Sequence, residues 1–237
     1  MPDSEQNEMT QCDLNTIIQL HEKWLNGEPE GKKADLSNTN LSNTNLSNTN
    51  LHGANLHGAD LHGADLHGAI LSGANLNGAN LNDANLNDAI LHGANLHGAD
   101  LHGADLHGAI LSGANLNDAD LHGAILNDAN LRSADLHGAN LHGANLNDAD
   151  LHGAILNDAN LRSADLHGAD VDFSSWPLWC GSLKGVKVDS RIARQLAYHL
   201  CSVVCDDPEF ISARNQILPF ANKFHRVGEC GKLKKVG

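Results

Sequence analysis

A leucine recurs at every fifth position from Leu36 to Leu166 without exception, which places 27 leucines in one register. A small residue, alanine or threonine, stands two positions before each of them, so the unit reads mostly A-(N/D)-L-x-x. A period of five matches neither the 3.6-residue period of a helix nor the two-residue period of a strand. The chain must therefore turn once in every unit, and such a repeat predicts a solenoid.

The turn is expected at the second residue after each leucine. In Leu51-His52-Gly53-Ala54 this residue is glycine, and the equivalent positions hold only Gly, Asn, Asp or Ser. These residues tolerate positive φ or close a turn through their own side chains. Six aspartates at this position are therefore expected to form turns: Asp83, Asp88, Asp118, Asp128, Asp148 and Asp158.

Four turns in 20 residues predict a squared coil, with the leucine and the small residue inside and the other three residues outside. Coils stacked like neighbouring strands would lie ~4.8 Å apart. The 28 units from Leu36 to Val171 predict about seven such coils.

This pattern resembles the pentapeptide-repeat family over residues 34–176. The resemblance implies a right-handed quadrilateral β-helix, so the expected fold class is an all-β solenoid with α-helical caps. The motif residues build the rod and therefore say little about function. Some members of the family resemble B-DNA in width and charge and bind DNA gyrase, which the resemblance suggests as one role for this chain.

Three regions are expected: an N-terminal capping helix segment (1–33), the β-helix (34–176) and a C-terminal helical cap or docking tail (177–237). Asp13 is expected to cap a helix that ends at Gly27. This helix is expected to cover the unpaired edge of the first coil, because an open edge invites aggregation.

The tail is expected to contain two helices. Ser190 is predicted to cap the first, and Asp207-Pro208-Glu209 is typical of the start of the second. Pro219 is expected to kink or end this second helix. An apolar face left over on the two helices could pair two chains into a homodimer.

Charge is unevenly distributed along the chain. Residues 34–176 contain seventeen aspartates and two arginines, a net charge of −15, whereas residues 177–237 contain ten bases and five acids, a net charge of +5. An acidic rod repels nucleic acid and attracts basic surfaces, so direct nucleic-acid binding is not expected. The simpler interpretation is that the charge keeps the rod soluble.

No signal peptide or membrane span is expected, because the first twelve residues lack an apolar segment and no run approaches 18 apolar residues. The five cysteines are an odd number and fit reduced thiols. A cytoplasmic protein is therefore predicted.

Two sets of aspartates directly precede central leucines at multiples of 20 residues. Asp60, Asp100 and Asp120 are predicted to share one face of the rod, and Asp65 and Asp105 another. Both faces are candidates for binding a basic partner, and plain solvation is the alternative.

Isoleucine replaces Asn or Asp before the leucine at Ile70, Ile90 and Ile110. These residues are 20 apart, so they are predicted to stack as an exposed apolar stripe. An aligned apolar row is a candidate contact site for a partner or a second rod. Ile125 and Ile155 make the same replacement singly on other faces.

Two groups of residues have metal-binding chemistry. His102, His122 and His142 are 20 apart and are expected to form a ladder in which a metal could bridge two rings. The alternative is that histidine is only tolerated at a solvated corner of a copied unit. In the tail, Cys201, Cys205, His225 and Cys230 form a metal-like cluster without the usual CxxC spacing, and buried cysteines are the alternative there. No cofactor is predicted.

No enzyme motif is present: the chain lacks a P-loop, GxGxxG after a strand, GxSxG and HExxH. We therefore expect a non-catalytic, rigid acidic scaffold for protein–protein interaction, with a protein partner of unknown identity. The alternative is a DNA mimic that binds DNA gyrase or topoisomerase. A zinc-dependent enzyme is the third hypothesis.

Overall fold

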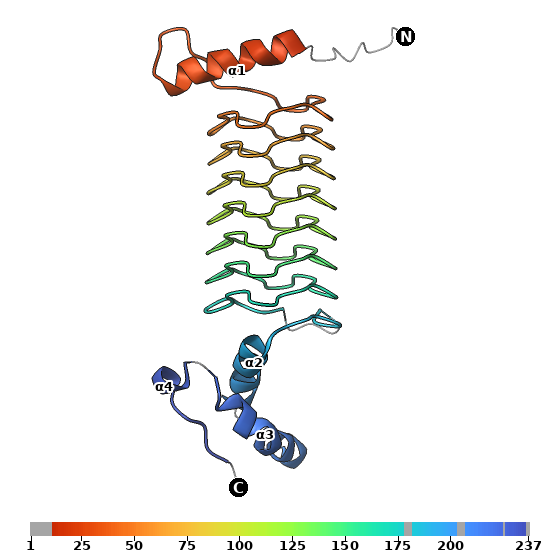
Figure 1. Ribbon diagram of the computed structural model, residues 1–237, viewed down its shortest axis with the longest axis vertical. Coiled ribbons are helices and arrows are strands. Elements are labelled where there is room, and N and C mark those ends of the chain that lie inside the picture. The colour runs from red at the N-terminus through yellow and green to blue at the C-terminus, as the bar shows by residue number, and fades with distance from the viewer. Residues whose placement is uncertain (1–10, 178–181, 203–206, 225, 236–237) are drawn as a thin grey trace. The chain divides into compact units, whose positions relative to one another are not determined.

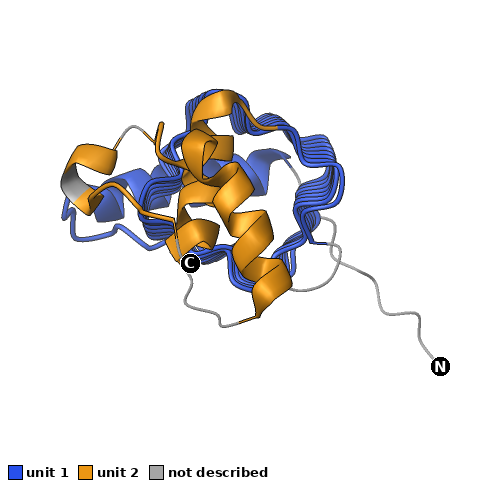
Figure 2. Cartoon of the chain, turned by 90° about the horizontal axis from the view of Figure 1, so that it is seen from below, with its two compact units in different colours: residues 1–187 blue, residues 188–237 orange. Residues whose placement is uncertain are grey.

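The computed structural model describes residues 11–177, 182–202, 207–224 and 226–235. The chain divides into two compact units, residues 1–187 and 188–237, which Figure 2 shows in different colours. Unit 1 contains helix α1 (Gln11–Leu25) and the repeats, and unit 2 contains α2 (Ser190–Ser202), α3 (Pro208–Ala221) and α4 (Val227–Cys230).

Each five-residue repeat makes one turn. The Ala94 N–H donates to the Leu91 carbonyl at 3.0 Å and closes a four-residue turn through His92 and Gly93. Gly93 has φ 63°, as the third residue of a type II turn requires. The six aspartates expected at this position also have positive φ, between 54° and 59°, which confirms that they form turns.

Coils stack through parallel bridges between residues 20 apart, such as Asn75↔Asn95 and Asn95↔Asn115. Around Leu96, the Leu96 N–H donates to the Asn115 carbonyl at 2.7 Å and the Asn95 N–H to the Ala74 carbonyl at 2.9 Å. These bridges stay isolated and form no longer strand in the described residues, because a turn follows each paired residue. The repeats thus form a β-helix with single-residue pairings (Figures 1 and 2).

The interior of the coils is filled by the two residue types that the repeat keeps constant. Every leucine from Leu36 to Leu166 is at most 1% exposed, and the alanines before them at most 2%. At about 25 cal/mol per Å² of apolar area, this burial is the main favourable term for the rod.

Helix α1 lies across the first coil (Figure 1). Leu14 and His21 on its inner face are buried, and the His21 Nδ1 accepts the Ala34 N–H at 3.0 Å. Gly27 has φ 72° and follows the end of the helix, as predicted. The prediction that Asp13 caps the helix was wrong, because α1 already includes Gln11 and Asp13 lies in its first turn.

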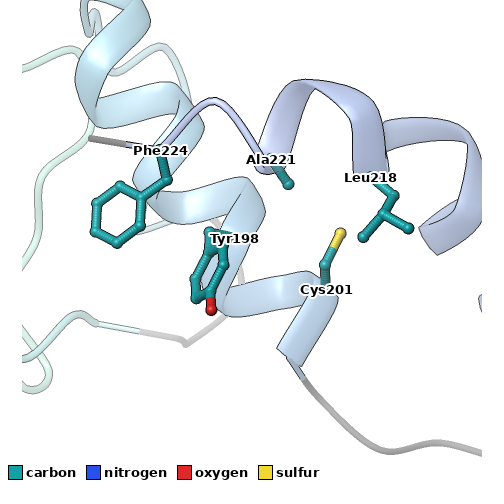
Figure 3. Packing of buried hydrophobic residues seen from close by; sticks show 5 residues of the cluster. All are labelled: Tyr198, Cys201, Leu218, Ala221 and Phe224. Carbon is teal, nitrogen blue, oxygen red and sulfur yellow. The ribbon is translucent and has the colours of Figure 1, made fainter. Parts of the chain in front are cut away.

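In unit 2, α2 and α3 pack around Tyr198, Cys201, Leu218, Ala221 and Phe224 (Figure 3). The Asp207 side chain accepts the Phe210 N–H at 2.8 Å, so the predicted start of α3 is confirmed.

Two details of the tail helices differ from the prediction. Asp189 caps α2 in place of Ser190, since its Oδ1 accepts the Arg191 and Ile192 N–H groups at 2.8 and 2.9 Å. Helix α3 does not end at Pro219 but continues to Ala221, and a kink at Pro219 stays a prediction. None of the described helices is both long and apolar enough to cross a membrane.

Candidate interaction surface

Three positions of each repeat face outward. We call the residue before the leucine the bridge position, the residue after it the outer position, and the next residue the turn position. In Asn95-Leu96-His97-Gly98 these are Asn95, His97 and Gly98.

The bridge position has a structural task that the sequence pattern did not reveal. The Asn95 Oδ1 accepts the His97 main-chain N–H at 3.2 Å. Because the other N–H groups of the repeat bond within the turn or to the neighbouring coils, this side chain satisfies the last one. An Asn or Asp at this position therefore stabilises the coil, whether or not it also contacts a partner.

The predicted aspartates have this task. Oδ1 accepts the N–H of the outer residue at 3.0–3.1 Å in each of Asp60, Asp65, Asp100, Asp105 and Asp120. Asparagines on adjacent coils donate to four of them: Asn80 to Asp60, Asn85 to Asp65, Asn87 to Asp105 and Asn140 to Asp120, at 2.9–3.0 Å. None of the five forms an ion pair with Lys or Arg in the described part of the chain. Their negative charge therefore remains available to a basic partner.

The four sides of the middle coils differ in their bridge residues. The acidic side carries Asp60, Asn80, Asp100 and Asp120, and the structure stacks Asp100 directly on Asp120. The mixed side, the next one along the chain, carries Asp65, Asn85, Asp105 and Ile125.

The remaining two sides are uncharged over these coils. The isoleucine side carries Ile70, Ile90 and Ile110, which bridge in succession as predicted. The amide side carries Asn55, Asn75, Asn95 and Asn115, whose side chains bond to one another at 3.1–3.2 Å. The isoleucine side therefore lies between an amide ladder and the mixed side with its two aspartates.

Isoleucine cannot accept the N–H of the outer residue. Among the described residues, the main-chain N–H groups of Ser72, His92 and Ser112, which follow the stripe, have no protein acceptor. The same holds for Asn127 and Asn157 after Ile125 and Ile155. The isoleucine side thus combines apolar side chains, of which Ile110 is 38% exposed, with unpaired backbone donors.

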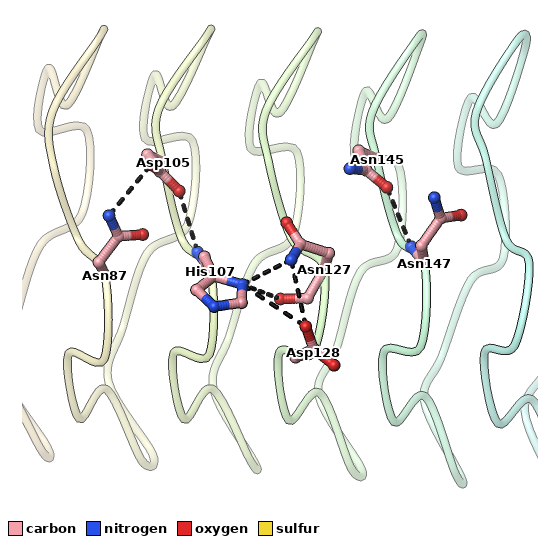
Figure 4. A network of polar contacts seen from close by, with 7 residues as sticks. All are labelled: Asn87, Asp105, His107, Asn127, Asp128, Asn145 and Asn147. Carbon is pink, nitrogen blue, oxygen red and sulfur yellow. Dashed lines mark hydrogen bonds and ion pairs between the residues drawn. The ribbon is translucent and has the colours of Figure 1, made fainter.

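Outer positions hold most of the histidines. Figure 4 shows one such environment, in which the His107 Nδ1 lies 3.6 Å from Asp128 and 3.2 Å from the Asn127 carbonyl oxygen. The expected ladder of His102, His122 and His142 is present, with edge-to-face ring centroids 5.1 and 4.7 Å apart.

The metal-like cluster of the tail is only partly placed. Cys205 and His225 lie outside the described residues, and Cys230 is exposed. Cys201 is buried among core side chains, and burial raises the pKa of its thiol. The described residues contain no group of three or more His, Cys, Asp or Glu arranged to hold a metal.

Several solved structures resemble this chain. HetL, a pentapeptide repeat protein involved in heterocyst differentiation regulation from Nostoc sp. strain PCC 7120, is 35% identical over 66% of this chain and 77% of its own, with a TM-score of 0.53. Rfr23, a pentapeptide repeat protein from Cyanothece 51142, is 39% identical over 40% of this chain and 60% of its own, with a TM-score of 0.35.

A trypsin-treated form of QnrB1, a plasmid-mediated fluoroquinolone resistance protein, is 23% identical over 73% of this chain and 98% of its own, with a TM-score of 0.43. No curated protein matches the chain.

The family model for pentapeptide repeats matches residues 34–73, 74–113, 114–153 and 144–174, in eight copies. These matches span more than half of the chain and follow the coils described above. The protein therefore belongs to the pentapeptide-repeat family.

Proposed function

We propose that this protein is a non-catalytic acidic scaffold that binds a protein partner through the isoleucine side of its rod. The β-helix is inferred to be right-handed with about seven coils, which makes a rigid support for such a surface. One observation carries the proposal: three consecutive coils replace the capping Asn or Asp with isoleucine on a single side.

The replacement is locally unfavourable. Each isoleucine exposes apolar surface and leaves one main-chain N–H without its side-chain acceptor, and a hydrogen bond of this kind contributes about 0.5–1.5 kcal/mol. Positions that break a local rule in a regular structure are expected at functional sites. A row of three such positions supports binding more strongly than the single Ile125 or Ile155 does.

The surroundings indicate the chemistry of the partner. Apolar side chains would pack on the isoleucines, carbonyl oxygens would accept the free N–H groups, and basic residues would approach Asp65 and Asp105 on the mixed side. The partner surface is therefore apolar with a basic border.

The test compares Ile90→Asn with Ile125→Asn. Both restore a capping asparagine, but only Ile90→Asn interrupts the stripe. The full chain and the two variants are immobilised and used to capture proteins from extracts of the source cells. A protein retained by wild type and Ile125→Asn, and lost with Ile90→Asn, supports the proposal, whereas equal retention by all three refutes it.

A homodimer is a second prediction for assembly. Leu200 on α2 and Ile217 and Phe220 on α3 are exposed by 50%, 36% and 40%. Light scattering on wild type and Leu200→Asp measures whether these helices pair two chains.

The DNA-mimic alternative relies on the acidic side, where Asp100 stacks on Asp120. It predicts binding to DNA gyrase that falls steeply with salt and is weakened by Asp100→Asn or Asp120→Asn. Binding through the isoleucine side would instead be nearly insensitive to these two substitutions.

A further inference from the structure

The outer positions of the rod contain thirteen histidines, but histidines follow one another on adjacent coils only in the column of His102, His122 and His142. In the other three columns histidine is separated by Ser, Asn or Arg. A cluster of imidazoles therefore occurs at one place along the repeats.

Within this column, His122 and His142 present a pair of nitrogens to each other. The His142 Nδ1 lies 3.3 Å from the His122 Nε2, and both side chains are half-buried. Without a ligand, two neutral rings at this distance share one hydrogen bond, since one nitrogen donates and the other accepts.

The same distance fits two ligands of a tetrahedral metal ion. Zinc–nitrogen bonds of about 2.0–2.1 Å place two tetrahedral ligands about 3.3–3.4 Å apart, whereas adjacent square-planar ligands would lie about 2.8 Å apart. We propose that the His122 Nε2 and the His142 Nδ1 bind one tetrahedral divalent cation of the zinc and cobalt class, with water in the remaining positions.

The two histidines are already positioned by the coils. The main-chain N–H of His122 donates to the Asp120 Oδ1 at 3.0 Å, and the main-chain N–H of His142 donates to the Asn140 Oδ1 at 3.3 Å. The Asn140 Nδ2 in turn donates to the Asp120 Oδ1 at 2.9 Å, which joins the two supports. The backbones are also bonded directly, since the Gly123 N–H donates to the His142 carbonyl at 2.9 Å, so the coils hold the two Cα positions from which the rings project.

His102 belongs to the ladder but is not one of the two proposed metal ligands. Its Nδ1 lies 3.2 Å from the Asn82 Oδ1, which orients the ring from the other side. The site therefore has two protein ligands, in keeping with the lack of any group of three in the described residues. The Asp120 carboxylate beside it supplies a negative charge that favours a cation.

The duplicated sequence offers a matched control. Residues 121–139 and 151–169 are identical, so His152 is the counterpart of His122 in the same LHGAI unit. Its column neighbours are Arg132 and Asp172, and its ring packs against Phe173 at 5.0 Å between centroids. Asparagine already occupies seven outer positions: Asn77, Asn82, Asn87, Asn117, Asn127, Asn147 and Asn157. A His→Asn substitution is therefore compatible with the coil.

The test is calorimetric titration of the full chain with zinc chloride, together with the visible absorption of added Co²⁺. Wild type and His152→Asn are expected to bind one ion at the ladder, with the Co²⁺ spectrum of a tetrahedral nitrogen and oxygen site. His122→Asn and His142→Asn are each expected to weaken this binding at least tenfold.

Three results would overturn the assignment: equal binding by His122→Asn and wild type, an equal loss in His152→Asn, or an equal loss in His102→Asn. Metal binding by the cysteines of the tail is a separate outcome, and Co²⁺ bound there would show a thiolate band in the near ultraviolet. If all the bound metal showed that band and were unaffected by His122→Asn, the proposal would be wrong.

Discussion

Asn145 accepts the main-chain N–H of Asn147 through its Oδ1 at 3.1 Å, as Figure 4 shows. One coil earlier, the bridge position holds Ile125, and the Asn127 N–H has no protein acceptor among the described residues. These two stacked positions differ in the capping hydrogen bond, so a substitution at Ile125 can measure its contribution.

Ile125→Asn is predicted to stabilise the rod. The new side chain can accept the Asn127 N–H and can join the stacked bridge residues Asp105 and Asn145. We expect the free energy of unfolding to rise by about 1 kcal/mol, measured by urea denaturation. Ile125→Ala is the control, because it removes the exposed apolar side chain without supplying an acceptor. If alanine stabilised the rod as much as asparagine does, the capping explanation would fail.

Gly103→Ala is predicted to destabilise the rod more than Gly113→Ala. Both glycines have positive φ, 66° and 65°, so both substitutions add backbone strain of about 1–2 kcal/mol. A Cβ on Gly103 would also lie 2.5 Å from the Asp83 Oδ1, whereas a Cβ on Gly113 meets nothing within 4 Å.

The double variant Asp83→Gly with Gly103→Ala separates the two effects. The Asp83→Gly substitution removes the clash and leaves the backbone strain. The free energy of unfolding lost between Asp83→Gly and the double variant is therefore expected to equal that lost between wild type and Gly113→Ala. Urea denaturation of wild type, Gly103→Ala, Gly113→Ala, Asp83→Gly and the double variant checks this. If Gly103→Ala cost as much in the Asp83→Gly background as in wild type, the Asp83 carboxylate would be excluded as the cause of the extra loss.

Arg214→Met is predicted to destabilise unit 2. The Arg214 Nε donates to the Cys201 carbonyl at 2.7 Å and its Nη1 to the Lys234 carbonyl at 3.0 Å, and the residue is 8% exposed. Methionine fills the space but removes both hydrogen bonds and leaves the buried Cys201 carbonyl without its donor, which costs about 1–3 kcal/mol. Thermal loss of the helical circular dichroism measures the change. Lys223→Met removes a positive charge at an exposed site and is expected to shift the transition little. If it lowered the transition temperature as much as Arg214→Met does, the lost charge and not the lost hydrogen bonds would explain the effect.

Most of the rod could be predicted from the sequence, because only a few residue types fit at the inside positions of the coil. Leucine at a strict period of five and turn formers after it fixed the interior and the corners, and the structure has both. The bridge position was read as an outward surface, since Asn and Asp are common on surfaces. Its capping bond became visible only when the backbone placed the Asn95 Oδ1 beside the His97 N–H.

Helix ends and single buried polar residues were less predictable. Asp189 and Ser190 are both good caps, and which one begins α2 depends on the local backbone. His21 gave no signal beyond its place on the apolar face of a helix. Its partner, the Ala34 N–H, is 13 residues away and is brought near by the turn after Gly27.

His21 makes the attachment of α1 sensitive to pH. Its pKa is lowered, mainly by burial, with a further contribution from the positive charge of Lys33, and these outweigh the main chain of His52, which raises it. Below the ordinary pKa of 6.5, the unfolded chain therefore binds more protons at this residue than the folded chain does. The stability that neutral His21 contributes is fully present above pH 6.5 and is lost as the pH falls from there through the lowered pKa. Protonation also removes the acceptor of the Ala34 N–H, which lies 3.0 Å from Nδ1.

Hydrogen exchange at single amides measures this effect. Between pH 7.5 and pH 5, the protection factor of the Ala34 amide is expected to fall at least tenfold, because its bond to His21 is broken when Nδ1 is protonated. The Asn75 amide bonds to the Ala54 carbonyl within the rod and should keep its protection, so it is the internal control. Equal losses at the two amides would mean that acid loosens the rod as a whole, and His21 would then not be the titrating group that holds α1.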